Sequence, residues 1–124
     1  MALDDVGVQL AQPSRPVVCI LGEGAAQYGI TALWTAVAYN VPVTYLVLRN
    51  EEYAILKWFA SMEDVEGAPG LDLPRLDVTA VASGYGVNAR EVGDGDLRDA
   101  LSEAIASDRP ELVEVRVAPG MALV

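Results

Sequence analysis

The sequence contains no histidine and a single cysteine, Cys19. Without histidine the chain has no Ser-His-Asp triad, no histidine general base and no His-ligated zinc site. One cysteine cannot form an internal disulfide, and Asp4 and Asp5 stand where a secretory signal would carry positive charge. These features predict a cytoplasmic protein, because the cytoplasm keeps thiols reduced.

Basic residues are scarce as well. Eight Lys and Arg residues against 18 Asp and Glu residues leave a net charge of −10. The chain therefore lacks the basic surface that nucleic acids and anionic membranes attract. It also lacks any apolar run of the roughly 18 residues that indicate a membrane-spanning helix. We expect neither a nucleic acid nor a membrane as partner.

What the sequence does contain is typical of a globular protein. Its 124 residues are 52% hydrophobic, which excludes intrinsic disorder and predicts one domain over residues 1–124. Residues 61–77 carry two prolines, two glycines and scattered acids, and we expect a long loop there.

Short apolar runs alternate with segments of helical periodicity along the whole chain. Apolar runs without polar alternation indicate strands that are covered on both faces, as in parallel sheets. Strands are predicted at residues 17–21, 43–49, 87–92 and 112–117, and helices at residues 3–11, 28–39, 51–62, 77–83 and 94–107. This order predicts an α/β fold with a doubly wound, mainly parallel sheet and helices on both faces, in three α/β/α layers.

Three details of this prediction concern single residues. The last strand alternates apolar residues with Glu114 and Arg116, which indicates a sheet edge or a half-exposed face. Asp77 is expected to cap the helix that follows it. Ile30, Leu33 and Trp34 recur at helical spacing and are expected to pack against the sheet.

The candidate binding site lies where the first two strands end. Ligands bind at the carboxyl ends of strands in such sheets, and here these ends are residues 22–27 and 49–52. The glycine spacing matches neither a Walker A loop nor the dinucleotide fingerprint. On spacing alone, a turn that only joins strand to helix is an equally good interpretation.

Two polar residues favour a binding role. Glu23 and Asn50 each follow a buried strand of the same βαβ unit, so their side chains are expected to meet over the edge of the sheet. A carboxylate, an amide oxygen and a nearby main-chain carbonyl are ligands of the kind that magnesium takes together with substrate phosphates.

This arrangement resembles the cofactor motif of thiamine-diphosphate enzymes, which is Gly-Asp-Gly after one strand and Asn-Asn a little under thirty residues later. Residues 22–59 are similar to the benzoylformate decarboxylase branch of that family, as are residues 69–74 and 84–87. The resemblance covers nearly the whole chain and corresponds to the C-terminal, diphosphate-binding domain of those enzymes.

The resemblance implies a role for individual residues. Glu23 stands at the position of the metal-ligating Asp, Asn50 at that of the metal-ligating Asn, and Glu52 at that of the residue that lends its main-chain carbonyl. The implied cofactors are thiamine diphosphate and Mg²⁺. The residues implied to line the diphosphate are Gly22, Gly24 and Ala25, and those implied to face the substrate pocket are Leu56 and Phe59.

Arg49 replaces the first Asn of the motif. An arginine is suited to clamping phosphate oxygens, so it is a further candidate cofactor-binding residue. Like Glu23, which is one methylene longer than the Asp, it is a departure from the family's pattern.

The reaction implied by the resemblance is decarboxylation of a 2-oxo acid, such as an aryl glyoxylate, to an aldehyde. In the family a separate pyrimidine-binding domain supplies the glutamate that activates the cofactor. We therefore expect these 124 residues not to be catalytically competent alone, and a pyrimidine-binding domain to be the partner if the chain is a natural split subunit.

Other interpretations remain open. The altered motif residues also fit a non-catalytic, autonomously folding α/β domain, excised or redesigned, that has lost cofactor binding. A flavin- or nucleotide-binding regulatory domain rests on fold analogy alone. Since domains of this family bury apolar surface against each other, we expect a homodimer that associates through the helical faces near Trp34, Trp58 and Phe59.

Overall fold

The computed structural model describes residues 4–65 and 67–121. Its strands form one sheet in the order β1-β2-β4-β3, and every neighbouring pair is parallel. The strands are β1 (Val17–Gly22), β2 (Val43–Arg49), β3 (Asn88–Val92) and β4 (Glu111–Arg116). The predicted parallel sheet is confirmed.

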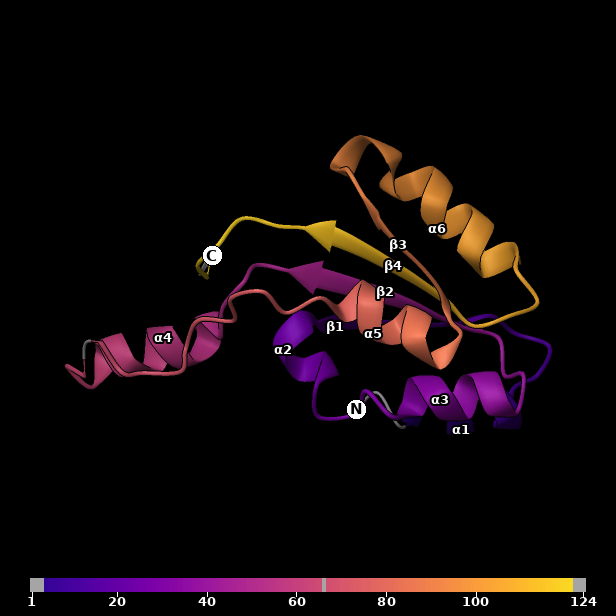
Figure 1. The fold of residues 1–124 in the computed structure, drawn as a ribbon, viewed down its shortest axis with the longest axis horizontal. Coiled ribbons are helices and arrows are strands. Elements are labelled where there is room, and N and C mark those ends of the chain that lie inside the picture. The colour runs from indigo at the N-terminus through magenta and orange to yellow at the C-terminus, as the bar shows by residue number, and fades with distance from the viewer. Residues whose placement is uncertain (1–3, 66, 122–124) are drawn as a thin grey trace.

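Helices cover both faces of this sheet, as Figure 1 shows. One face carries α1 (Asp4–Ala11), α2 (Glu23–Ala26), α3 (Ala32–Ala38) and α5 (Val78–Tyr85). The other face carries α6 (Leu97–Ala106), which follows the 3-10 turn η1 (Asp94–Asp96). The three-layer prediction is therefore confirmed, while α4 (Ala54–Met62) projects beyond the carboxyl ends of the strands (Figure 1).

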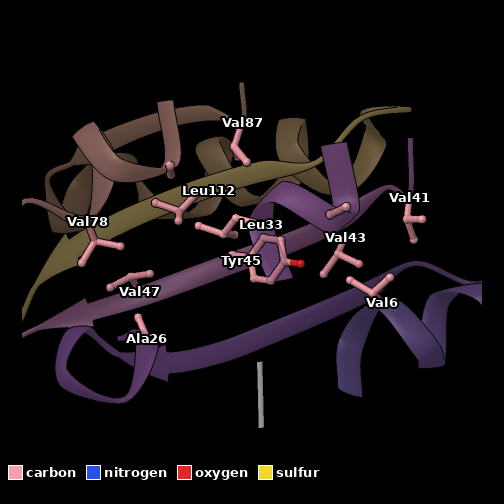
Figure 2. Close-up of a cluster of buried hydrophobic side chains, with 12 residues drawn as sticks. Val6, Ala26, Leu33, Val41, Val43, Tyr45, Val47, Val78, Val87 and Leu112 are labelled. Atoms are coloured by element: carbon pink, nitrogen blue, oxygen red, sulfur yellow. The ribbon is translucent and has the colours of Figure 1, made fainter. Parts of the chain in front are cut away.

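The core consists of two clusters, one on each face, because successive side chains of a strand point to opposite faces. On the larger face Tyr45 and Val47 of β2 and Leu112 of β4 meet side chains of α1, α2, α3 and α5 (Figure 2). On the other face Leu46 and Val113 pack against α6. Residues 43–47 of β2 are all buried, as the run without polar alternation predicts. The same prediction is wrong for β1, which lies at the edge of the sheet with Val18 39% and Ile20 64% exposed.

The prediction that the last strand lies at an edge or half-exposed is wrong. β4 lies between β2 and β3, and its residues 111–115 are all buried. The polar residues of β4 fit there because each has a partner. Glu111 accepts hydrogen bonds from Asn88 Nδ2 at 2.7 Å and Ser107 Oγ at 2.9 Å, and Glu114 is paired with Arg49.

Two predicted helices begin later than expected. Residues 28–31 form turns before α3. In α3, Leu33 is buried and Ile30 before it is packed against the core, but Trp34 is 54% exposed. The expectation that Trp34 packs on the sheet is wrong, since neighbouring residues of a helix point in directions about 100° apart.

The helical pattern predicts that a helix begins at residue 51, but α4 starts at Ala54. The main chain of residues 51–53 instead contacts residues 71–73, with Tyr53 N donating to Leu71 O and Leu73 N donating to Glu51 O, both at 2.8 Å. Tertiary pairing has overridden the local helical pattern.

Other predicted boundaries agree within a few residues. Asp77 caps α5, its carboxylate accepting a hydrogen bond from Ala80 N at 2.8 Å. Of the opening helix predicted over 3–11, residue 3 lies outside the described residues. Within the described part of the chain, no helix is long and apolar enough to cross a membrane.

Candidate functional site

The ends of β1 and β2 lie side by side in the sheet, with Gly22 in register with Leu48. Both strands end at the same edge of the sheet, where β1 is followed by α2 and β2 by the loop of residues 50–53. Parallel pairing therefore brings together the two segments of the candidate binding site, residues 22–27 and 49–52.

Glu23 joins these two segments directly. Its side chain is only 2% exposed, and its Oε1 accepts hydrogen bonds from the main-chain N–H of Asn50 at 3.1 Å and of Glu51 at 2.5 Å. The carboxylate therefore meets the main chain of residues 50–51. A buried carboxylate needs such donors, because an unpaired buried charge is costly.

The loop after β2 is held in a tight turn. Asn50 Oδ1 accepts a hydrogen bond from Glu52 N at 3.3 Å, an Asx-type contact. Glu51 adopts a positive φ of 63°, a conformation that costs a non-glycine residue energy and persists only where its surroundings enforce it. The hydrogen bonds that the main-chain N–H groups of Asn50 and Glu51 donate to Glu23 help to hold this conformation.

The carboxylate of Glu52 is engaged elsewhere. Lys57 Nζ lies 2.5 Å from one of its oxygens and Gly120 N donates to the other at 2.5 Å. The hydrogen bond from Lys57 is the main reason why the pKa of Glu52 lies below its usual value. This leaves the main-chain carbonyl of Glu52, the atom implied by the resemblance, as its candidate metal ligand.

The guanidinium of Arg49 contacts two acidic side chains. It lies 3.3 Å from Glu114 Oε1 and 3.2 Å from Glu51 Oε1, and the Arg49 side chain is 13% exposed. Burial raises the pKa of Glu114, although the charge of Arg49 opposes the rise. Glu114 Oε2 has no hydrogen-bond partner among the described residues. Arg49 thus neutralises a buried acid and holds Glu51 at the same time.

The two glycines of the motif have different surroundings. A Cβ on Gly22 would make only an ordinary contact, 3.8 Å from Leu48 O. A Cβ on Gly24 would lie 2.5 Å from Tyr53 Cε1 and 3.1 Å from Leu73 Cδ1. Gly24 is buried under these two side chains, whereas the neighbouring Ala25 is exposed.

The residues expected to face substrate lie on α4. Leu56 is 46% exposed and Phe59 is 50% exposed, and α4 has no buried residue. The rings of Trp58 and Phe59 contact each other, with centroids 4.9 Å apart. This apolar helix therefore follows directly after residues 50–53 in the chain but lies outside the core.

The donor set matches magnesium in its chemistry. No cluster of three or more Cys, Asp or Glu side chains able to hold a metal occurs among the residues that the structure describes. A metal here would instead use Glu23, Asn50 Oδ1 and the Glu52 carbonyl, completed by water and phosphate oxygens, which is the mixed oxygen set that magnesium prefers.

Three residues of the site, Tyr53, Leu73 and Glu114, do not stand out in the sequence as site residues. The sequence pattern predicts a helix at Tyr53 and a loop at Leu73. Tyr53 and Leu73 approach Gly24 because residues 51–53 pair with residues 71–73. No local sequence pattern predicts this pairing. An acid between two valines of β4 is the sequence signal that points to Glu114.

Comparisons with known proteins identify relatives of the chain. The family model described as "Thiamine pyrophosphate enzyme, C-terminal TPP binding domain" matches residues 5–115. A benzoylformate decarboxylase from Pseudomonas aeruginosa is 52% identical over 111 residues, which cover 89% of this chain and 21% of that protein.

Solved structures agree with this similarity. The thiamine diphosphate-dependent 4-hydroxybenzoylformate decarboxylase of Rhodococcus jostii RHA1 superposes with a TM-score of 0.90 and 41% identity, covering 95% of this chain and 23% of that chain. Benzoylformate decarboxylase from Polynucleobacter necessarius has a TM-score of 0.88 and 33% identity, covering 99% of this chain and 24% of that one. The chain thus spans less than a quarter of the length of these relatives.

Proposed function

The chain belongs to the C-terminal TPP-binding domain family of thiamine pyrophosphate enzymes, and from that membership we propose that it binds thiamine diphosphate and Mg²⁺ where β1 and β2 end. The observation that carries the proposal is the contact between the Glu23 carboxylate and the main chain of Asn50. It brings the two halves of the cofactor motif together at one edge of the sheet.

In this proposal the Glu23 carboxylate, Asn50 Oδ1 and the Glu52 carbonyl hold the metal. Glu23 Oε1 already orders the loop, so Oε2 is the oxygen offered to the ion. Magnesium tolerates little departure from octahedral geometry, so its ligands must be held in place. The hydrogen bonds to Glu23 hold the loop that carries two of them.

The main chain of Gly22, Gly24 and Ala25 would line the diphosphate. Arg49 lies beside this site, and a contact with phosphate requires it to exchange its partner Glu51 for a phosphate oxygen. Its bond to the buried Glu114 remains available to hold the guanidinium in place.

We propose further that the whole protein decarboxylates an aryl 2-oxo acid to the corresponding aldehyde and carbon dioxide. The names of the relatives from Pseudomonas aeruginosa and Rhodococcus jostii support this class of substrate. Bound thiamine diphosphate supplies the carbanion chemistry, and a pyrimidine-binding domain is the proposed partner. Leu56 and Phe59 on α4 are the proposed contacts to the aryl group.

The binding proposal is tested by calorimetric titration of the chain with thiamine diphosphate in the presence and absence of Mg²⁺. We expect magnesium-dependent binding that Glu23→Gln weakens by at least the roughly tenfold loss that outer-shell changes cause at metal sites. Glu63→Gln, an acid-to-amide change at an exposed residue next to α4, is the matched control and should bind as the unaltered chain does.

The same titration tests the alternative that the domain has kept its fold but no longer binds the cofactor. Two main-chain amides already occupy one oxygen of Glu23, which favours a structural role for this carboxylate. If only a chain carrying Glu23→Asp and Arg49→Asn binds the cofactor, the domain has kept its fold and lost its function. If neither chain binds, the proposed cofactor site is wrong.

A further inference from the structure

Of the two motif glycines, Gly24 is the one that other side chains cover closely, whereas a Cβ on Gly22 would meet only Leu48 O at 3.8 Å. A Cβ built on Gly24 would lie 2.5 Å and 3.0 Å from two ring carbons of Tyr53. Because real Cβ atoms do not approach other atoms that closely, only glycine fits beneath the ring as it stands. The space that this glycine leaves free is filled by the chain itself.

The main chain that carries Tyr53 is firmly held. Tyr53 N donates to Leu71 O and Leu73 N donates to Glu51 O, both at 2.8 Å. Lys57 Nζ contacts the carboxylates of both Glu52 and Asp72 at 2.5 Å. These bonds fasten residues 71–73 to residues 51–53 as a strap, so the strap is a fixed part of the site.

The ring itself is held less firmly. Its hydroxyl accepts a hydrogen bond from Gln27 Nε2 at 3.3 Å, between exposed atoms. Exposed hydrogen bonds of this length contribute little, because water replaces them readily. The ring can therefore rotate away from Gly24 while the strap keeps its bonds.

We propose that Tyr53 is a cover over Gly24 that the diphosphate must displace. The inference rests on the proposed function, in which the diphosphate lies against the main chain of Gly24. The ring and the phosphate compete for the same place, so the ligand binds the uncovered form. Its apparent affinity is lowered by the fraction of molecules in which the ring covers Gly24.

The position of the Tyr53 ring distinguishes a glycine that leaves room for a ligand from one that leaves room for another side chain. A glycine that only spares room for a ligand leaves open space above its Cα when no ligand is bound. Gly24 has the Tyr53 ring there instead, and Leu73 closes the side of the same space. Removing the ring opens this space without altering Glu23, Asn50 or the strap.

Calorimetry on the full chain tests the cover, with Mg²⁺ and either thiamine diphosphate or inorganic pyrophosphate as ligand. We expect Tyr53→Ala to lower the apparent Kd for both ligands about tenfold, since it removes the competing state. Tyr53→Phe, which loses the hydroxyl contacts with Gln27 and Tyr28 but keeps the ring, should change the Kd a few-fold at most. Tyr39→Ala removes a 71% exposed tyrosine just after α3 and should leave the Kd unchanged.

A second readout does not depend on a measured affinity. The NMR signal of the Gly24 amide should shift in Tyr53→Ala because a nearby aromatic ring is lost. In the unaltered chain, Mg²⁺ and pyrophosphate should move this signal toward its position in Tyr53→Ala. An unchanged Gly24 signal in Tyr53→Ala would overturn the cover whatever the titrations give.

The two proposals fail differently. Equal or weaker binding by Tyr53→Ala, with binding by the unaltered chain, overturns the cover and leaves the cofactor site standing. No binding by either chain overturns both, while the Gly24 signal still reports whether the ring lies on this residue.

Discussion

At the scale of single residues, Gly24 and Tyr53 form a pair in which each depends on the size of the other. We expect Gly24→Ala to destabilise the fold by about 1 kcal/mol, the low end of the usual cost of overpacking, because the new Cβ displaces the movable Tyr53 ring and lies 3.1 Å from Leu73 Cδ1. In a chain that already carries Tyr53→Ala, the same change should cost much less, because the ring carbons 2.5 Å and 3.0 Å from the new Cβ are gone. Urea unfolding of the four chains measures this coupling.

The control for this cycle is Gly22→Ala, since a Cβ there meets nothing closer than 3.8 Å. Its cost should be the same with Tyr53 or Ala at position 53. Additive costs for Gly24→Ala and Tyr53→Ala would show that the ring does not lie on Gly24, because residues in contact couple and independent ones add.

Residues also differ in how far the sequence reveals them. Glu23 and Asn50 were predictable neighbours, because each follows an apolar strand and adjacent parallel strands end at the same edge. Tyr53 was not, because its position depends on residues 71–73 returning to pair with residues 51–53. That pairing joins segments about twenty positions apart, and local periodicity carries no record of it.

At the scale of elements, β4 shows why polar alternation misled. An acid in an apolar strand usually indicates exposure to water. Glu114 is buried because Arg49 of the neighbouring strand β2 reaches its carboxylate at 3.3 Å. The parallel direction of the strands follows from the alternation of strands and helices, but the position of one strand within the sheet depends on such pairs between strands.

Helix α5 was predicted with its cap, and the cap can be tested. The carboxylate of Asp77 accepts hydrogen bonds from Ala80 N and Thr79 Oγ1, both at 2.8 Å. Asp77→Ala should therefore destabilise the fold by about 1 kcal/mol at pH 7, the usual cost of losing an N-cap. Asp108→Ala, at a side chain that is 98% exposed, is the control and should cost far less in thermal or urea unfolding.

The cap also predicts a pH dependence. The bond from Ala80 N lowers the pKa of Asp77 below its usual 3.8. The lowered pKa means that this stabilisation is complete above the unfolded-state value and is lost as the pH falls through the folded-state value. The difference in stability between the unaltered chain and Asp77→Ala should thus shrink below about pH 4. A constant difference down to pH 2 would contradict an ionised cap.

At the scale of the whole molecule, apolar exposure and net charge oppose each other. Phe59 and Met62 of α4 and Trp34 of α3 are at least half exposed, which favours the homodimer that the sequence predicts. The net charge of −10 favours separation. Salt weakens only the second effect, because it shortens the range of repulsion from about 10 Å at 0.1 M to about 3 Å at 1 M.

Self-association should therefore increase with ionic strength. Sedimentation equilibrium is expected to show a larger dimer fraction at 0.5 M than at 0.05 M NaCl. Phe59→Glu should return the chain to monomer at both, since it places a charge in the apolar face of α4 and adds to the net negative charge. Ile105→Glu adds the same charge on α6, at a residue that is 40% exposed on the opposite layer. If both substitutions reduce association equally, net charge alone controls it and α4 is not the contact surface; if only Phe59→Glu does, the contact is through α4.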